Sequence, residues 1–181
     1  MGNALPPAFD ELWVSDRPRQ NAAYTELMAA TEGPVPWTPD AWDEVVANLT
    51  HADNHNRAIA AQILCNLAAH DPAERILGDL DALMKVTKDE RFVTARHSLK
   101  SLWKIGLGTP AQRQAVVKAL EHRYGESASE KNGTLVRSDI VESLRRLHDA
   151  VEDPEIETVA RALIEDEPDL KYRRKYAKHW Q

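Results

Sequence analysis

Residues 91–106 carry the clearest helical pattern in the chain, because apolar side chains recur there every three or four positions. One face of this predicted helix is apolar and comprises Phe92, Ala95, Leu99 and Leu102, with Trp103 at its border. The flank of that face carries three cations four residues apart, Arg96, Lys100 and Lys104. Like charges at this spacing repel by about 0.2–0.5 kcal/mol per pair. We therefore expect the surroundings of this helix, or a partner, to account for the cationic stripe.

Four proline steps divide the chain after residue 37 into helix pairs. Each step places a capping side chain before a proline that would occupy the first helical position. The steps are Thr38-Pro39, Asp71-Pro72, Thr109-Pro110 and Asp153-Pro154, spaced 33, 38 and 44 residues apart. Glu74 and Gln112 stand three residues after two of the caps and complete a capping-box pattern. This spacing indicates an internal repeat.

The predicted elements are one helix in a lead-in segment and four helix pairs. The lead-in covers residues 1–37, contains a helix at 20–31 and ends in a segment that prolines break. The repeat array covers residues 38–181. Its helices are expected at 39–49 and 54–69, 72–86 and 90–105, 110–124 and 134–150, and 154–164 and 169–178.

The second helices of these pairs share one register of arginine and leucine. Arg57 precedes Leu64 by seven residues and Leu67 by ten. The same offsets join Arg137 to Leu144 and Leu147, and the middle helix has Leu102 and Ile105 at the leucine positions. Together with the proline starts, this pattern resembles the HEAT-repeat family of α-solenoids over residues 38–180. The resemblance implies an all-α superhelix of about four HEAT-like helix pairs, and it carries no activity with it.

The aligned arginines favour a structural role. In HEAT-like repeats an arginine at the position of Arg57 and Arg137 often pairs with acidic groups of an adjacent repeat, and a buried arginine needs such a partner. Contact with a ligand is the alternative. The middle helix has Ala95 at this position, and Arg96 follows one residue later, about 100° around the helix. Arg96 need not do the same job.

Composition fits a soluble helical protein of one domain or one short array. The chain has 181 residues, of which 43% are hydrophobic and 29% charged, with only seven glycines. Its net charge of -6 argues weakly against a general nucleic-acid binder. Cys65 is the only cysteine, which excludes an intrachain disulfide and a cysteine-based zinc site. Without a signal-peptide pattern or a run of about 20 apolar residues, we expect a cytoplasmic location and no membrane contact.

The charges are distributed unevenly between the two helices of each pair. The first helices are acidic and the second helices basic, and second helices line the concave face of a solenoid. This predicts a basic concave groove. The competing interpretation is that acids near helix starts and bases near helix ends complement the helix dipole. That explanation covers Lys100, Lys104 and Arg145, but not Arg91 or Arg96, which lie in the first half of their helix.

We therefore expect a non-enzymatic HEAT-like binding module that holds an acidic protein or peptide on its concave face. The candidate partner-binding residues are Arg96, Lys100, Trp103, Lys104, Arg137 and Arg145. The alternative is a nucleic-acid-binding or DNA-repair protein like the alkyl-purine DNA glycosylases of the HEAT type. That family uses a tryptophan and an aspartate on one helix, whereas Leu107 stands four residues after Trp103 here. No catalytic residue can be assigned, and no cofactor is expected.

Three other features carry weaker chemical signals. His51, Asp53 and His55 could hold a metal, but their segment fits a polar turn in which Asp or Asn caps the next helix. Cys65 lies among apolar residues and is expected to be a small buried side chain. The C-terminal segment interleaves aromatic residues with five bases, which suits a terminal cap or contact with an acidic partner or nucleic acid.

Overall fold

The computed structural model describes residues 4–181, and every regular element in that range is a helix. The α-helices are α1 (Ala8–Glu11), α2 (Arg17–Ala30), α3 (Thr38–Asn48), α4 (Asn54–Ala69), α5 (Ile76–Val86), α6 (Phe92–Ser101), α7 (Pro110–Glu126), α8 (Gly133–Val151), α9 (Pro154–Asp166) and α10 (Leu170–Ala177). Three 3₁₀ turns follow α6, α7 and α10, namely η1 (Leu102–Leu107), η2 (Ser127–Ser129) and η3 (Lys178–Trp180).

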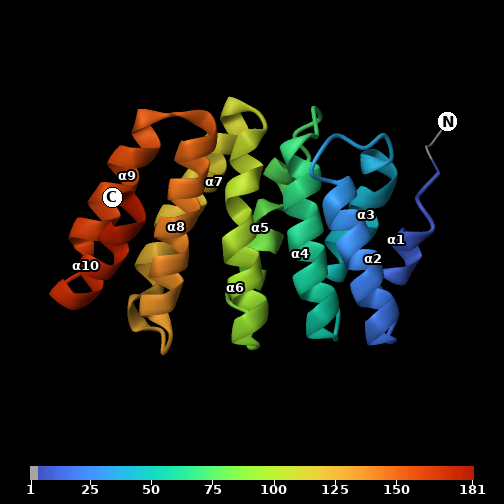
Figure 1. Cartoon of the computed structure of the whole chain (residues 1–181), viewed down its shortest axis with the longest axis horizontal. Coiled ribbons are helices and arrows are strands. Elements are labelled where there is room, and N and C mark those ends of the chain that lie inside the picture. The colour runs from blue at the N-terminus through green and yellow to red at the C-terminus, as the bar shows by residue number, and fades with distance from the viewer. Residues whose placement is uncertain (1–3) are drawn as a thin grey trace.

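The helices form two layers (Figure 1). In the second-helix layer, α2, α4, α6, α8 and α10 follow one another in a row, and α3, α5, α7 and α9 form the other layer behind them. Helices α1 and α10 lie at opposite ends of the row. The chain is therefore an all-α solenoid of consecutive helix pairs, as its sequence predicts. Among the described residues, no helix is long and apolar enough to cross a membrane.

Two of the four proline steps begin a helix as predicted. Thr109 accepts a hydrogen bond from the N–H of Gln112, whose side chain bonds back to the Thr109 N–H and completes a capping box. Asp153 caps α9 by accepting from the N–H of Glu155. Proline follows both caps at the first helical position, where its missing N–H costs nothing.

The other two steps differ from the prediction. Thr38 already lies inside α3, and its hydroxyl donates to the Val35 carbonyl instead of capping the helix. Asp71 begins a turn in which its carboxylate accepts from the N–H groups of Ala73 and Arg75, and α5 starts only at Ile76. Glu74 has a φ of 54°, which no α-helix contains, so the predicted capping box at this residue is wrong.

One core runs through the array. The predicted leucine positions of the second helices are all at most 1% exposed, and they are Leu64, Leu67, Leu102, Ile105, Leu144 and Leu147. The same core includes Phe9, Leu12 and Leu27 from the predicted lead-in. Helix α2 packs against α4 and is tied to it by hydrogen bonds from Gln20 to Asn56 and from Tyr24 to Gln62. The segment before residue 38 is thus packed as part of the solenoid.

Arginines join each repeat to the next, as predicted. Arg57 donates from Nε and Nη2 to Asp89 over 2.6 and 2.9 Å, and Arg137 donates to Glu167 over 2.7 Å. The two acids lie in the turns before α6 and α10, one repeat further along the chain. Each pair therefore fixes a second helix to the inter-helix turn of the following repeat.

The connection between the second and third repeats uses an arginine from the other layer. Ala95 leaves the aligned position without a charge, and Arg123 of α7 supplies one from the other layer. The guanidinium of Arg123 is 1% exposed and bonds Glu130, in the turn before α8, over 2.6 and 2.8 Å. It also bonds the Thr87 hydroxyl and carbonyl over 3.1 Å each. Arg123 thus connects the same two turns that an arginine at position 95 would reach.

Candidate functional site

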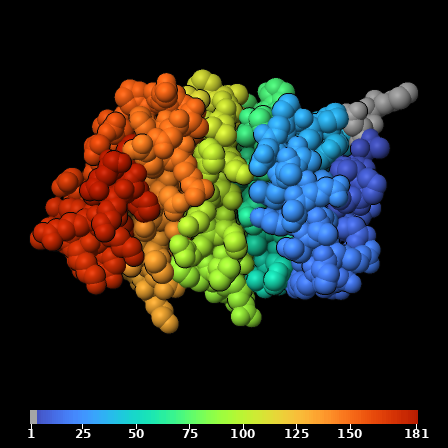
Figure 2. All heavy atoms as spheres, in the orientation of Figure 1, coloured from blue at the N-terminus to red at the C-terminus, as the bar shows by residue number. Residues whose placement is uncertain are grey.

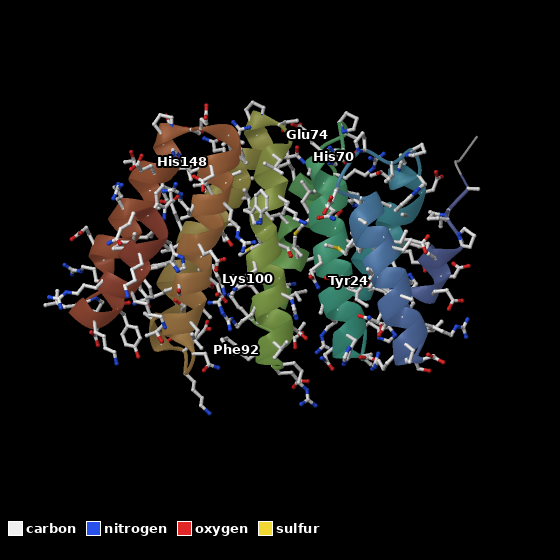
Figure 3. All side chains as sticks on the ribbon, viewed as in Figure 1. Tyr24, His70, Glu74, Phe92, Lys100 and His148 are labelled. Carbon is white, nitrogen blue, oxygen red and sulfur yellow. The ribbon has the colours of Figure 1, made fainter. Side chains whose placement is uncertain are left out.

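The cations predicted to bind another molecule already form ion pairs or hydrogen bonds within the chain. Arg96 donates from Nε and Nη2 to the Asp139 carboxylate over 2.7 and 2.8 Å. Lys100 Nζ lies 3.4 Å from Glu142 and 3.8 Å from Asp139. Figure 3 shows Lys100 on the side of α6 that faces α8. The hydrogen bonds to Asp139 raise the pKa of Arg96. The seam between α6 and α8 is therefore a network of compensated charges.

Lys104 does not continue the stripe of Arg96 and Lys100. The helix changes to a 3₁₀ turn at Leu102, and such a turn rotates by about 120° per residue instead of 100°. Lys104 consequently points to α4, where its Nζ donates to the Asn66 side chain over 2.7 Å. Because α4 and α8 flank α6 on opposite sides (Figure 1), the predicted single stripe is divided between two flanks.

Trp103 and Lys104 share a small pocket with the C-terminal ends of α2 and α4. The pocket has a volume of about 260 Å³, and its wall also includes Thr31, Asn66 and His70. Trp103 packs against the core, and its buried Nε1 has no hydrogen-bond partner within residues 4–181. The structure thus places these two predicted residues together, away from Arg96 and Lys100.

Arg137 and Arg145 lie on α8 and are also paired. Besides its bond to Glu167, the Arg137 guanidinium lies 4.8 Å from the centre of the Tyr124 ring. Arg145 Nε lies 2.8 Å from Asp149, and its guanidinium lies 5.3 Å from the centre of the Trp180 ring. Arg137 is held by its ion pair to the following repeat, whereas Arg145 lies on the surface of α8.

The second-helix layer contains a groove that the sequence did not reveal. It has a volume of about 680 Å³ and crosses α2, α4 and α6 near the level of Tyr24. Figure 2 shows α4 receding between the atoms of α2 and α6 on this face. The groove is lined by Arg17, Gln20, Asn21, Tyr24, Asn54, His55, Ala58, Ile59, Gln62, Val93, Thr94 and His97. Three repeats therefore contribute to one surface depression.

Hydrogen bonds between neighbouring helices hold the floor of the groove. The Tyr24 hydroxyl donates to Gln62 over 2.8 Å, and the Gln62 amide donates to the Ala58 carbonyl. Asn54 of α4 donates to the Thr94 hydroxyl of α6 over 3.3 Å. Burial raises the pKa of Tyr24, so its hydroxyl remains a donor at neutral pH. The floor is thus a fixed surface of amides, hydroxyls and one aromatic ring.

The ionisable side chains of the groove share one sign. Apart from Tyr24 they are Arg17, His55 and His97, and among the described residues that line the groove none carries a carboxylate. Arg17 is anchored at the rim by Asp53 over 2.6 Å. Val93 stands between the polar residues and is 67% exposed, so its side chain is available for an apolar contact. The groove therefore combines one arginine, whose charge Asp53 compensates, and two histidines with an exposed apolar side chain.

Part of this groove can be recognised on helical wheels of α2 and α6 drawn from the sequence. Tyr24, Asn21 and Arg17 lie on one side of α2, and Val93 and His97 lie four apart on α6. An exposed valine and an outward aromatic residue are informative only when the helices are known to be neighbours. The lead-in helix α2 was not predicted to flank α4, and for that reason the groove was missed.

The polar turn before α4 is a helix cap. Asp53 accepts from the N–H of His55 and binds Arg17, while its own N–H donates to the His51 ring. Within residues 4–181, no group of three or more histidine, cysteine or acidic side chains is arranged to hold a metal ion. Cys65 is buried as predicted, and burial raises the pKa of its thiol to about 12. This part of α4 carries packing and capping residues.

Comparison with solved structures supports the fold. An engineered protein of the Northeast Structural Genomics Consortium has a TM-score of 0.52 and 17% identity, with 98% of this chain and 96% of that chain covered. A designed armadillo repeat protein in complex with the peptide (KR)4 has a TM-score of 0.51 and 16% identity, covering 98% and 88%. No family model matches the chain, and no curated protein sequence matches it. The fold class is that of helical-repeat solenoids.

Proposed function

We propose that the chain is a binding module that holds an extended acidic peptide segment in the groove across α2, α4 and α6. The observation that carries this proposal is the groove itself, which combines amide and hydroxyl groups with Arg17, His55 and His97 and contains no carboxylate. Amides and hydroxyls suit the backbone of an extended segment, and cationic rims suit its acidic side chains. Val93 offers an apolar contact between them.

The sign of the groove distinguishes this chain from one of its structural neighbours. A designed armadillo repeat protein of the same fold class is in complex with the peptide (KR)4, whose side chains are all basic. The groove described above contains no carboxylate that would pair with such a peptide. We therefore propose that this scaffold selects the opposite charge.

The cations of the α6–α8 seam belong to the proposal as a secondary contact. Lys100 is 39% exposed, and its distances of 3.4 and 3.8 Å to two carboxylates leave it free to turn towards a ligand. Arg96 is held by two short hydrogen bonds, and Lys104 is engaged by Asn66. Of the six residues predicted from sequence, we infer that Lys100 and the exposed part of Arg145 reach the acidic segment. Trp103, Lys104 and Arg137 support the face from within.

A peptide array tests the proposal directly. The array would present eight-residue sequences whose net charge ranges from strongly acidic to strongly basic, with (KR)4 included and a labelled DNA duplex as a separate probe. We expect binding of the full chain to increase with acidic content and to weaken with salt, because exposed charges are screened. Replacing Val93→Glu and His97→Glu together should abolish this binding.

A matched control separates the groove from a general charge effect. Leu77 of α5 is 42% exposed on the opposite layer, so Leu77→Glu adds one negative charge outside the groove and is the matched control for Val93→Glu alone, which adds one inside it. Binding by the Leu77→Glu variant should equal that of the wild type. Acidic-peptide binding that survives the groove substitutions, or the absence of any peptide signal, would contradict the proposal. Preferential capture of the duplex would favour the nucleic-acid alternative instead.

A further inference from the structure

The outer face of α10 and η3 carries a stripe of cations that, unlike Arg96, Arg137 and Arg145, form no ion pair within the described residues. Its members are Lys171, Arg174, Lys175 and Lys178, all exposed. Within residues 4–181 none of the four forms an ion pair, whereas the adjacent Arg173 is paired with Glu165. The stripe lies on α10, at one end of the row of helices (Figure 1).

The fold does not require this stripe. Tyr176 fixes α10 to α8 by donating its hydroxyl to the Thr134 carbonyl, and its ring is fully buried. Arg174 and Lys178 stand two residues before and after Tyr176, about 200° around the helix, so they face away from the core. Cations three and four residues apart repel one another. Arg174 and Lys175 also lie in the last turn of α10, where a cation complements the helix dipole, and Lys171 Nζ lies 5.6 Å from the centre of the Tyr172 ring. Four cations without an ion pair on one exposed face suit a partner of opposite charge.

The opposite end of the same molecule is acidic. Residues 1–50 contain eight acidic side chains and two arginines, whereas residues 170–181 contain five cations and no acid. Glu26 follows Tyr24 by two residues in α2, and Glu44 follows Trp42 by two residues in α3. Tyr24 and Trp42 each contact the next repeat, through Gln62 and Asp79. The two glutamates, about 200° around their helices, therefore lie on the sides of α2 and α3 that face away from the next repeat.

From these two surfaces we propose that the chain associates head to tail, with the α10 stripe of one copy against the acidic N-terminal end of a second copy. The ends lie at opposite extremes of a rigid row of helices, so they cannot meet within one molecule. Every copy that offers the cationic end also offers the acidic end in equal amount. Nucleic acid is the other anionic partner that such a stripe could bind, and the experiment below separates the two.

The expected association is weak and open-ended. Exposed ion pairs each contribute little, and salt screens them. A contact between two different surfaces does not close on itself unless the rotation closes a ring, so copies would add in a chain. We therefore expect concentration-dependent growth at low ionic strength and a monomer at high ionic strength.

Sedimentation velocity of the full chain, at salt concentrations of about 25 and 500 mM, measures this association. The first variant reverses the stripe with Lys171→Glu, Arg174→Glu, Lys175→Glu and Lys178→Glu. The second reverses the N-terminal end with Asp10→Lys, Glu26→Lys and Glu44→Lys. Each variant alone should remain monomeric at low salt, because both ends of the first variant are then acidic and the N-terminal end of the second no longer has an excess of acids to attract its stripe. An equal mixture of the two should associate, since each variant offers the end that the other lacks.

The mixture makes the proposal falsifiable even if a single variant is perturbed. Circular dichroism and thermal melting would show that both variants are folded. A wild type that stays monomeric at low salt overturns the proposal, and so does a mixture of folded variants that fails to associate. If the wild type instead binds a DNA duplex and the stripe variant does not, the stripe serves nucleic acid and the head-to-tail assignment is wrong.

Discussion

Arg96 on α6 and Asp139 on α8 form a two-pronged ion pair that joins two neighbouring repeats. The Asp139 side chain is 2% exposed and the Arg96 side chain 37% exposed, so the carboxylate is buried and the guanidinium reaches the surface. A buried carboxylate needs this compensation, because its removal from water is costly. The residue that breaks the arginine register of the repeat therefore has a structural partner of its own.

Removing Arg96 should destabilise the fold. Because Asp139 would remain buried with only Lys100 nearby, we expect Arg96→Ala to lower the free energy of unfolding by about 2–3 kcal/mol, less than for a fully buried pair. Arg96→Lys should restore only part of this loss, because an ammonium group cannot form the two parallel bonds. Urea denaturation measures both changes. Arg161→Ala removes an exposed i,i+4 pair with Glu157 and should change little, and an equal effect at both sites would contradict the assignment.

Arg57 and Asp89 should make stability depend on pH. Burial of the Asp89 carboxyl raises its pKa, but hydrogen bonds from Arg57 and from the Arg91 N–H outweigh burial, and the pKa of Asp89 lies below its ordinary value. A carboxyl with a lowered pKa stabilises the fold above its unfolded pKa of about 3.9 and loses that contribution as the pH falls through its folded pKa. The difference in unfolding free energy between the wild type and Arg57→Met should therefore narrow below about pH 4. A difference in unfolding free energy that stays constant from neutral to acidic pH would refute this role.

Substitutions at Arg123 and Ala95 test whether Arg123 takes the place of an aligned arginine at position 95. Arg123→Met would leave Glu130 and the Thr87 carbonyl without their bonds and should cost about 2–4 kcal/mol. Adding Ala95→Arg restores an arginine at the aligned position, beside a pocket of about 250 Å³ that Ala95 and Arg123 both line. We expect the second substitution to recover part of the loss only in the Arg123→Met background. A double-mutant cycle with no coupling would show that the two positions are independent.

Two glycines, one near the end of α7 and one at the start of α8, should respond in opposite directions to substitution by alanine. A Cβ on Gly133 would lie 2.1 Å from the Ser127 carbonyl oxygen, so Gly133→Ala forces the backbone apart and should cost about 2 kcal/mol or more. A Cβ on Gly125, within α7, meets nothing within 4 Å. Gly125→Ala should therefore gain up to about 1 kcal/mol, because alanine favours the helix. Thermal unfolding of the two variants distinguishes them, and a stable Gly133→Ala protein would show that this turn is not as close as described.

Local sequence determined the helical architecture. The periodicity of Leu64, Leu102 and Leu144 predicted a buried face on each second helix, because the 3.6-residue period acts within a single element. The arginine register, through its resemblance to HEAT repeats, predicted that Arg57 and Arg137 pair with acids of an adjacent repeat, without identifying which acids. Thr109 and Asp153 are correct helix starts, whereas Asp71 is not, because the positive φ at Glu74 interrupts the helix that its proline would begin.

Tertiary structure decided where the charges go and where a ligand can bind. Arg96 and Lys104 are eight residues apart on one predicted face, yet the 3₁₀ turn and the neighbouring helices direct them to Asp139 and Asn66 on opposite sides. The groove requires Tyr24 of α2 beside α4 and Val93 of α6, residues separated by about seventy positions. Such neighbours depend on how helices pack and not on the spacing within any of them. The sequence therefore determined the repeats, and their packing decided which side chains are left for a partner.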